Sequence, residues 1–447
     1  LASSVSMSGG VLDADETLTI SGALTQSGNI TIDVATGKTL TYSGAAVNLG
    51  ANTLTMSGEG RLSNSNDLVL NNASSKLLLS NSITIDNVST SANNSGLDVD
   101  ANSTVTSLTV GHTTPVSIAS GKTLSGAITV TAGSIKLGEA GTLASTVSMS
   151  GGTLDADESL TLSGALTQAG NITIDVANTK TLTYSGTALS LGANTLTLSG
   201  GGSLVSGGLT LNNASSKLLL DSITVDNVST SLASLGLDVN ANSTVTSLSV
   251  GHITPVSIAS GKTLSGAITV SAGSLKLNET GTLASTISMS GGVLDADESS
   301  TVSGALSHSA DITIDVASGK TLTYSGAALN LGAYTLTLSG EGRLSNTYVL
   351  GLNNANSKLL LSGSITVDRV STSLASLGLD VDGDSTVTSL SVGHITPVSI
   401  ASGKTLSGAI TVTAGSIKLG EAGTLGSSVS MSGGTLDADE SLTLSGA

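Results

Sequence analysis

Apolar and polar residues alternate along many short stretches of this chain. In "NITIDV", Ile30, Ile32 and Val34 occupy every second position, and Thr31 and Asp33 stand between them. Successive side chains of an extended strand point to opposite faces, so the pattern predicts strands with aliphatic residues inside and Thr or Asp outside. No stretch of useful length has the i, i+3, i+4 spacing of an amphipathic helix. The chain is therefore predicted to be all-β.

Turn-forming words separate the predicted strands. "SGA", "TGK", "SGK" and "GAN" recur every ~6 to 14 residues and predict tight corners. The three prolines, Pro115, Pro255 and Pro397, each open the strand "PVSIA", where a missing backbone N–H is tolerated.

A long internal repeat organises these strands. The word "SMSGG" places its methionine at Met7, Met149, Met289 and Met431, which gives a nearly constant period. We name the copies repeat 1 (1–142), repeat 2 (143–282), repeat 3 (283–424) and repeat 4 (425–447), and expect them to form one continuous solenoid. Exposed terminal repeats of a solenoid are normally capped, whereas this sequence stops inside repeat 4. We therefore expect a piece of a longer array, or a subunit whose ends stack on neighbours.

A shorter rhythm appears within each repeat. "TLTISGA" begins at Thr17, and the related word "TLTYSGA" begins at Thr39. The spacing of related words predicts about seven coils of about 20 residues per repeat, with six coils of about 24 as the alternative. The predicted fold is an elongated parallel β-helix, or β-solenoid, of about 22 coils. With ~4.8 Å between neighbouring strands, one repeat would advance it by about 34 Å.

Repeat 2 is shorter than repeat 1 by two single residues. One loss lies between Ser57 and Asn71, and the other turns "SNSI" at Ser80 into "DSI" at Asp221. A slip of one residue inside a strand would turn its apolar set outward. Both losses are therefore predicted to lie in polar corners.

Composition limits the kind of core and the kind of partner. The chain contains no Phe, Trp or Cys and only five Tyr. The interior must therefore consist of Leu, Ile, Val and Ala in many thin layers. A formal charge of −17 with only 15 basic residues argues against nucleic-acid binding. The sequence contains no run of ~18 apolar residues, so it predicts no membrane-spanning segment. The chain begins at Leu1 and not at Met, which indicates a processed product or a fragment.

Several words carry a resemblance to a known class of proteins. "GKTLTYSGAA", "LGANTLTLSGGGSL" and "LNNASSKLLL" resemble those of giant repetitive bacterial surface proteins and autotransporter-type passengers. The resemblance implies a right-handed parallel β-helix, an extracellular or cell-surface location in bacteria, and a role as adhesin, fibre or coat. It carries over no catalytic residue.

The word "LDADE" is the most conspicuous candidate site. Two aspartates at i and i+2 lie ~6.6 Å apart along a strand, so Asp13 and Asp15 could share one Ca²⁺. Calcium takes six to eight oxygen ligands, and the glycine-rich nonapeptide of calcium-binding β-rolls is missing. We favour a corner of solvated acids that turns near Asp15 and Glu16, because an unpaired buried Glu is costly. The alternative is a Ca²⁺ site at each pair: Asp13 and Asp15, Asp155 and Asp157, Asp295 and Asp297, Asp437 and Asp439.

Histidines form a second candidate set. His112, His252 and His394 occur once per repeat, and His308 stands where the earlier repeats have Gln. No Cys, second His or nearby acid completes a metal site or a catalytic triad. A surface corner is the favoured interpretation.

The word "KLLL" raises the possibility of contacts between molecules. Leu77 and Leu79 can face inward together only if Leu78 faces outward. The favoured interpretation is a bend at the corner that buries all three. In the alternative, Leu78, Leu219 and Leu360 are lateral contact points between rods, since exposed apolar residues often mark association.

These patterns favour a non-catalytic structural component of an extracellular filament, surface coat or adhesin stalk. Its expected partner is itself, through head-to-tail or lateral assembly. The alternative is an adhesive passenger that binds a cell-surface glycan or protein. A polysaccharide lyase is disfavoured because the coils are uniform and only three arginines are present. Ice binding is disfavoured because Thr53 and Thr55 come too soon after Thr39 and Thr41 to continue a threonine ladder.

Overall fold

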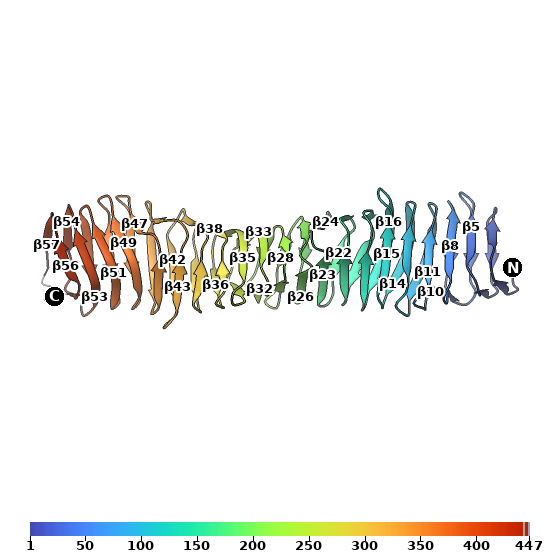
Figure 1. The fold of residues 1–447 in the computed structure, drawn as a ribbon, viewed down its shortest axis with the longest axis horizontal. Coiled ribbons are helices and arrows are strands. Elements are labelled where there is room, and N and C mark those ends of the chain that lie inside the picture. The colour runs from blue at the N-terminus through green and yellow to red at the C-terminus, as the bar shows by residue number, and fades with distance from the viewer. Residues whose placement is uncertain (441–442, 446–447) are drawn as a thin grey trace. The chain divides into compact units, whose positions relative to one another are not determined.

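The chain folds entirely into β-strands and turns. The computed structural model describes residues 1–440 and 443–445, and these contain strands but no helix. Two compact units are present, Leu1–Thr210 with Ser215–Asp226, and Leu211–Ala214 with Asn227–Ala447. Each unit is a parallel β-solenoid whose strands lie side by side (Figure 1), and together the units have about 22 turns. The predicted all-β solenoid is thus confirmed.

Each coil contributes strands to two long parallel sheets. The first sheet, here sheet 1, takes one strand per coil and begins with β2 (Val11–Ala14) and β5 (Ile30–Val34). The second, here sheet 2, takes the strands that follow in the same coil, such as β3 (Leu18–Ile20), which pairs with β6 (Thr39–Tyr42) in the next coil. Every residue thereby has its neighbours about one coil earlier and one coil later in the sequence.

Seven coils make up each repeat. In repeat 1, sheet 1 continues through β8 (Thr53–Gly58), β11 (Lys76–Leu79), β13 (Gly96–Val99), β15 (Thr114–Ile118) and β17 (Ser134–Leu137). The next strand, β20 (Thr153–Ala156), carries the "LDA" that β2 carried. Coils vary in length, because the step from Ile32 to its partner Met56 is longer than the step from Val99 to its partner Ile118. Seven coils, not six, therefore fit each repeat.

Aliphatic side chains stack in register through the interior. Leu54 pairs with Leu77, and Leu77 with Leu97, and all three are at most 1% exposed. Burying one such side chain stabilises the fold by ~1.5–3 kcal/mol. Because each lies between a partner in the preceding coil and one in the following coil, the core is a continuous column of thin layers, as the lack of Phe and Trp predicted.

Glycine permits the closest approach between coils. Gly126 in β16 (Thr123–Val130) has φ +120°, and a Cβ there would lie 1.8 Å from the carbonyl oxygen of Val105 in β14 (Ser103–Val110). The register between these strands shifts just after Val105. Only glycine can occupy this bulge without moving the backbone.

The two residues missing from repeat 2 were removed from corners, as predicted. The second loss falls between β29 (Lys217–Leu220) and β30 (Thr224–Val225), where Ser222 adopts φ +57°. A left-handed conformation costs a non-glycine residue roughly 1–2 kcal/mol. The corner is strained in this way while the inward side chains of both flanking strands keep their register.

Two adjacent leucines test the alternation of inward and outward residues. Leu218 is fully buried, whereas Leu219 is half-buried and on the outer face of β29. We expect Leu218→Ala to cost ~2–5 kcal/mol through the cavity that it leaves, and Leu219→Ala to cost less than ~1 kcal/mol. Thermal or denaturant unfolding of the two variants measures the difference. Equal losses would contradict the assigned strand orientation.

Candidate functional site

The acid cluster of repeat 1 lies at a corner. Strand β2 ends at Ala14 and the chain bends at Asp15 and Glu16, as expected. Asp13, Asp15 and Glu16 are all exposed, and the Glu16 carboxylate accepts a hydrogen bond from the Lys38 ammonium at 2.5 Å. The equivalent glutamates of the next repeats form the same ion pair one coil on, Glu158 with Lys180 at 2.5 Å and Glu298 with Lys320 at 2.6 Å.

In repeats 2 and 3 a lysine of the preceding coil neutralises the first aspartate. Lys136 of β17 lies in register with Asp155 of β20, and its ammonium is 2.9 Å from that carboxylate. In repeat 3, Lys276 lies 3.2 Å from Asp295 and 2.9 Å from Asp297. The "SIKL" or "SLKL" word of one coil and the "LDADE" word of the next therefore form one electrostatic unit.

A second aspartate stacks on the first in the following coil. Asp155 lies in register with Asp175 of β23 (Ile172–Val176), and Asp295 with Asp315 of β42 (Ile312–Val316). Like charges directly opposite each other on neighbouring strands are destabilising. The hydroxyl of Ser199 donates a hydrogen bond to Asp175, which partly compensates that charge. The outer face of sheet 1 thus carries a short column in the order Lys, Asp, Asp, Ser.

Burial and ion pairing change the pKa of Asp295 in this column in opposite directions. Burial raises the pKa of Asp295, although the Lys276 ammonium opposes that change. The hydrogen bond to Asp297 raises the pKa of Lys276, and the hydrogen bond to Asp155 raises the pKa of Lys136. Each lysine is thus held in its charged form more firmly than in the unfolded chain.

The geometry leaves few ligands for calcium. Among residues 1–440 and 443–445, no group of three or more His, Asp or Glu side chains is placed to hold one ion. Asp155, Asp295 and Asp297 are bound by lysine, and Asp437 lies in register with Lys418. Asp13, Asp15, Asp157 and Asp439 are exposed. Calcium binding at these pairs stays a prediction.

The repeated histidines occupy surface corners. His112, His252 and His394 are exposed at the bend that precedes a strand of sheet 1. His308 differs, because its ring packs edge-on against Tyr334 with centroids 5.7 Å apart, and its Nδ1 lies 3.0 Å from the carbonyl oxygen of Ala310. None of the four lies within a cluster of potential metal ligands in the described chain.

The favoured interpretation of "KLLL" was wrong. Strand β11 runs straight through the word, with Leu77 and Leu79 fully buried and Leu78 half-buried on the outer face. No bend buries all three, because the strand must keep its register with β8 and β13 on either side. Leu219 and Leu360 repeat this placement. Their role as lateral contacts stays a prediction.

Threonines form short columns that the sequence spacing concealed. Thr123, Thr142, Thr161 and Thr183 stand in register on four successive coils of sheet 2, and Thr263, Thr282, Thr301 and Thr323 do the same in the next repeat. Thr53 and Thr55 lie in β8 of sheet 1, on a different face, which explains their early arrival in the sequence. The first column ends at Val205 and the second at Ser345.

A shallow groove accompanies the first threonine column. Its volume is about 310 Å³, and small residues at Gly121, Ala140 and Gly141 create the hollow. Thr142, Thr161 and Thr183 line it, and their hydroxyls form no hydrogen bond to other described residues. These hydroxyls are free to bind water or a polar ligand.

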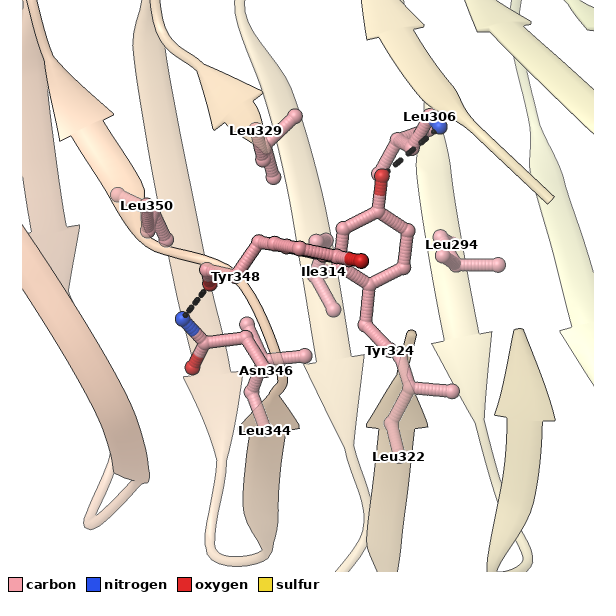
Figure 2. A pocket seen from close by; sticks show the side chains of 10 residues that line it. All are labelled: Leu294, Leu306, Ile314, Leu322, Tyr324, Leu329, Leu344, Asn346, Tyr348 and Leu350. Carbon is pink, nitrogen blue, oxygen red and sulfur yellow. Dashed lines mark hydrogen bonds between the residues drawn. The ribbon is translucent and has the colours of Figure 1, made fainter. Parts of the chain in front are cut away.

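The interior of repeat 3 contains a small void that is too small for a ligand. Figure 2 shows its lining, which includes Tyr324, Tyr348 and Asn346 among aliphatic side chains. The volume is about 10 Å³, room for about one water molecule. The Tyr324 hydroxyl accepts a hydrogen bond from the Leu306 backbone N–H at 3.1 Å, and burial raises the pKa of Tyr324. Tyr42 and Tyr184 make the equivalent bond, so this tyrosine is structural.

Sequence reasoning missed an apolar surface at one corner. Six aliphatic side chains about half-exposed to solvent lie there, three in repeat 2 and three in repeat 3: Leu232, Leu235, Ile253, Leu374, Leu377 and Ile395. Alternation gave no signal, because these residues lie outside the strands. A comparison of the repeats would have shown it, since repeat 1 has Ala92, Ser95 and Thr113 at these positions.

The raised lysine pKa values predict a dependence of stability on pH. A lysine whose pKa is higher in the folded state stabilises that state fully below its unfolded value of 10.5, and loses this contribution as the pH rises through the folded pKa. We expect Lys136→Met with Lys276→Met to lower the melting temperature slightly at pH 8. The corresponding loss in the free energy of unfolding is less than ~1 kcal/mol for each partly exposed pair. The difference from the unsubstituted protein should disappear near pH 12.

Melting curves followed by circular dichroism between pH 8 and pH 12 measure this difference. Lys122→Met is the control, because Lys122 forms no ion pair among the described residues. A difference that stays constant across the whole pH range would show that the lysines act through packing and not through charge.

No helix in the described part of the chain is long and apolar enough to cross a membrane.

The chain was compared with protein families, with curated proteins and with solved structures. None of the three comparisons found a match.

Proposed function

We propose that this protein is a non-catalytic structural element of an extracellular filament, surface coat or adhesin stalk. The observation that carries the proposal is the uninterrupted parallel ladder within each unit, in which every coil is hydrogen-bonded to the next. A stack of this kind resists bending because bending must stretch backbone hydrogen bonds and open buried aliphatic contacts together. Stiffness is the property that a stalk or filament needs.

The placement of reactive side chains favours a role without catalysis. The Lys, Asp and Glu side chains described above form ion pairs on the outer face or project from corners, and the repeated histidines are exposed. An enzyme needs an acid and a base to converge on a concave site with perturbed pKa values. The groove beside the threonine column contains hydroxyls but no ionisable group.

The proposed location at the bacterial cell surface rests on composition and resemblance. A chain without Cys needs no particular redox compartment, and a formal charge of −17 keeps an extended protein soluble. The words shared with repetitive surface proteins and autotransporter-type passengers favour the same location.

Electron microscopy of the purified full-length chain tests the structural role. Seven coils per repeat at ~4.8 Å predict an axial period of about 34 Å or a multiple of it. We expect filaments or bundles with that period to form at high protein concentration. Isolated short particles at every concentration would contradict self-assembly and favour a monomeric binding role.

The groove beside Thr142, Thr161 and Thr183 favours the second candidate function, an adhesive passenger that binds glycans. Free hydroxyls spaced by one coil could hydrogen-bond a polysaccharide laid along the stack.

An array of bacterial and host-cell polysaccharides tests this candidate. We expect Thr161→Val with Thr183→Val to weaken binding about tenfold, because one or two neutral hydrogen bonds of ~0.5–1.5 kcal/mol are lost. Thr55→Val on sheet 1 is the matched control and should bind as the unsubstituted protein does. The absence of binding to any polysaccharide, or equal binding by both variants, would exclude the groove as a glycan site.

A further inference from the structure

One corner of the solenoid exposes aliphatic side chains on two adjacent coils. In repeat 2, Leu232 and Leu235 precede β32 (Gly236–Val239) and are 51% and 53% exposed. Ile253 precedes β34 (Thr254–Ile258) and is 52% exposed. Because Leu237 of β32 pairs with Val256 of β34, the two corners lie next to each other. We call these three side chains the apolar corner of repeat 2.

The same apolar corner recurs one repeat later in the same unit. In repeat 3, Leu374, Leu377 and Ile395 are 50%, 53% and 48% exposed. The strands of sheet 1 connect the two corners through seven successive pairings, from β32 to β50 (Gly378–Val381). Seven coils place the two corners about 34 Å apart along the stack.

Repeat 1 shows that the fold does not need these aliphatic residues. Its corner is polar, with Ala92, Ser95 and Thr113 in the three positions. Asn93 accepts a hydrogen bond from the Thr113 backbone N–H at 3.0 Å, and Asn94 donates one to the Thr114 hydroxyl at 3.1 Å.

Repeats 2 and 3 give up these polar contacts. Ala233 and Ser234 replace the two asparagines in repeat 2, and the buried Ser234 hydroxyl has no hydrogen-bond partner among the described residues. In repeat 3, the buried Ser376 hydroxyl likewise has no hydrogen-bond partner among the described residues. Leu235 replaces Ser95, whose hydroxyl donates a hydrogen bond to the Ala73 carbonyl oxygen at 2.9 Å in repeat 1. Half of each leucine side chain is left in water, which is unfavourable unless something covers it.

The absence of charged residues around this corner allows a second copy of the acidic chain to approach it. The chain has a formal charge of −17, so two copies repel each other over most of their surface. The corner segments 231–235, 251–253 and 271–273 contain no Asp, Glu, Lys or Arg, and neither do 373–377, 393–395 and 413–415. Two acidic chains can therefore meet here without placing like charges in contact.

The size of the corner points to the same partner. A stable interface buries about 800 Å² on each side, far more than three half-exposed aliphatic side chains provide. A partner must cover both corners at once, and so must present two apolar sites about 34 Å apart. A second copy of this chain has that spacing, and in a twofold-symmetric pair each corner meets an identical patch. Engaging two weak contacts together strengthens them well beyond either one.

We propose that the apolar corners of repeats 2 and 3 form a lateral self-association surface, through which two copies of this chain pack side by side. The proposal does not depend on the filament role, because it requires only a dimer in solution. It assigns lateral contact to the corner and not to Leu78, Leu219 and Leu360.

The decisive variant transplants the polar corner of repeat 1 into repeats 2 and 3. Repeat 1 carries these residues in the same fold, so the variant is expected to fold. The substitutions are Leu232→Ala, Ala233→Asn, Ser234→Asn, Leu235→Ser, Ile253→Thr, Leu374→Ala, Ala375→Asn, Ser376→Asn, Leu377→Ser and Ile395→Thr.

Sedimentation velocity of the full chain at rising concentration measures association. We expect the unsubstituted protein to form dimers and the transplanted variant to associate at least tenfold more weakly, with an unchanged circular dichroism spectrum. A variant with the corner of repeat 2 alone transplanted should be intermediate. An unsubstituted protein that is monomeric at all concentrations, or a transplanted variant that associates equally well, would overturn the proposal.

Two further variants separate this surface from others. The reverse change in repeat 1, Ala92→Leu with Ser95→Leu and Thr113→Ile, adds a third apolar corner and should strengthen association. Leu78→Thr with Leu219→Thr and Leu360→Thr is the matched control on sheet 1 and should leave association unchanged. If this control loses its dimers while the transplanted variant keeps them, the contact lies at "KLLL" and the proposal for the apolar corner is wrong.

Discussion

The parallel pairing of each coil with the next is the constraint on which the rest of this structure depends. Because β2, β5 and β8 lie in register, a residue that faces inward in one coil must meet an inward residue in the next. The interior column of Leu54, Leu77 and Leu97 exists for this reason. A change of length can be absorbed only where the pairing is interrupted, and the strained Ser222 marks one such corner in repeat 2.

The same register decides what the outer face can do. Outward side chains stack at the spacing of the strands, so a lysine in one coil is placed directly on an aspartate in the next, as Lys136 is on Asp155. In repeats 2 and 3 such pairing neutralises the first aspartate of "LDADE" with a cation that the chain itself supplies. It also collects threonines from four coils into one column, which gives the outer face a polar surface that no single coil possesses.

The repeats behave as natural variants of one another. Most of their inward positions keep the same character, with Ser300 in place of the buried Leu160 as an exception. Corners differ more, as between the polar corner at Asn93 and Asn94 and the apolar corner at Leu232 and Leu235. A corner is free to change because it contributes no inward layer to the core. Differences in surface chemistry between repeats are therefore concentrated at corners, where they alter contacts with other molecules at little cost to the fold.

Alternation in stretches such as "NITIDV", together with the regular return of "SMSGG", was enough to predict an all-β solenoid of about seven coils per repeat, because strand orientation and coil length are local properties. The bend at Asp15 and Glu16 followed from the cost of burying a charge. The pairing of Lys136 with Asp155 and the adjacency of Leu235 and Ile253 came only from the tertiary structure. The sequence left two orientations open for Leu78, and the strand register decided for the outward one. Coils differ in length from one to the next, so sequence separation does not reveal which side chains are stacked; the register of the sheets does.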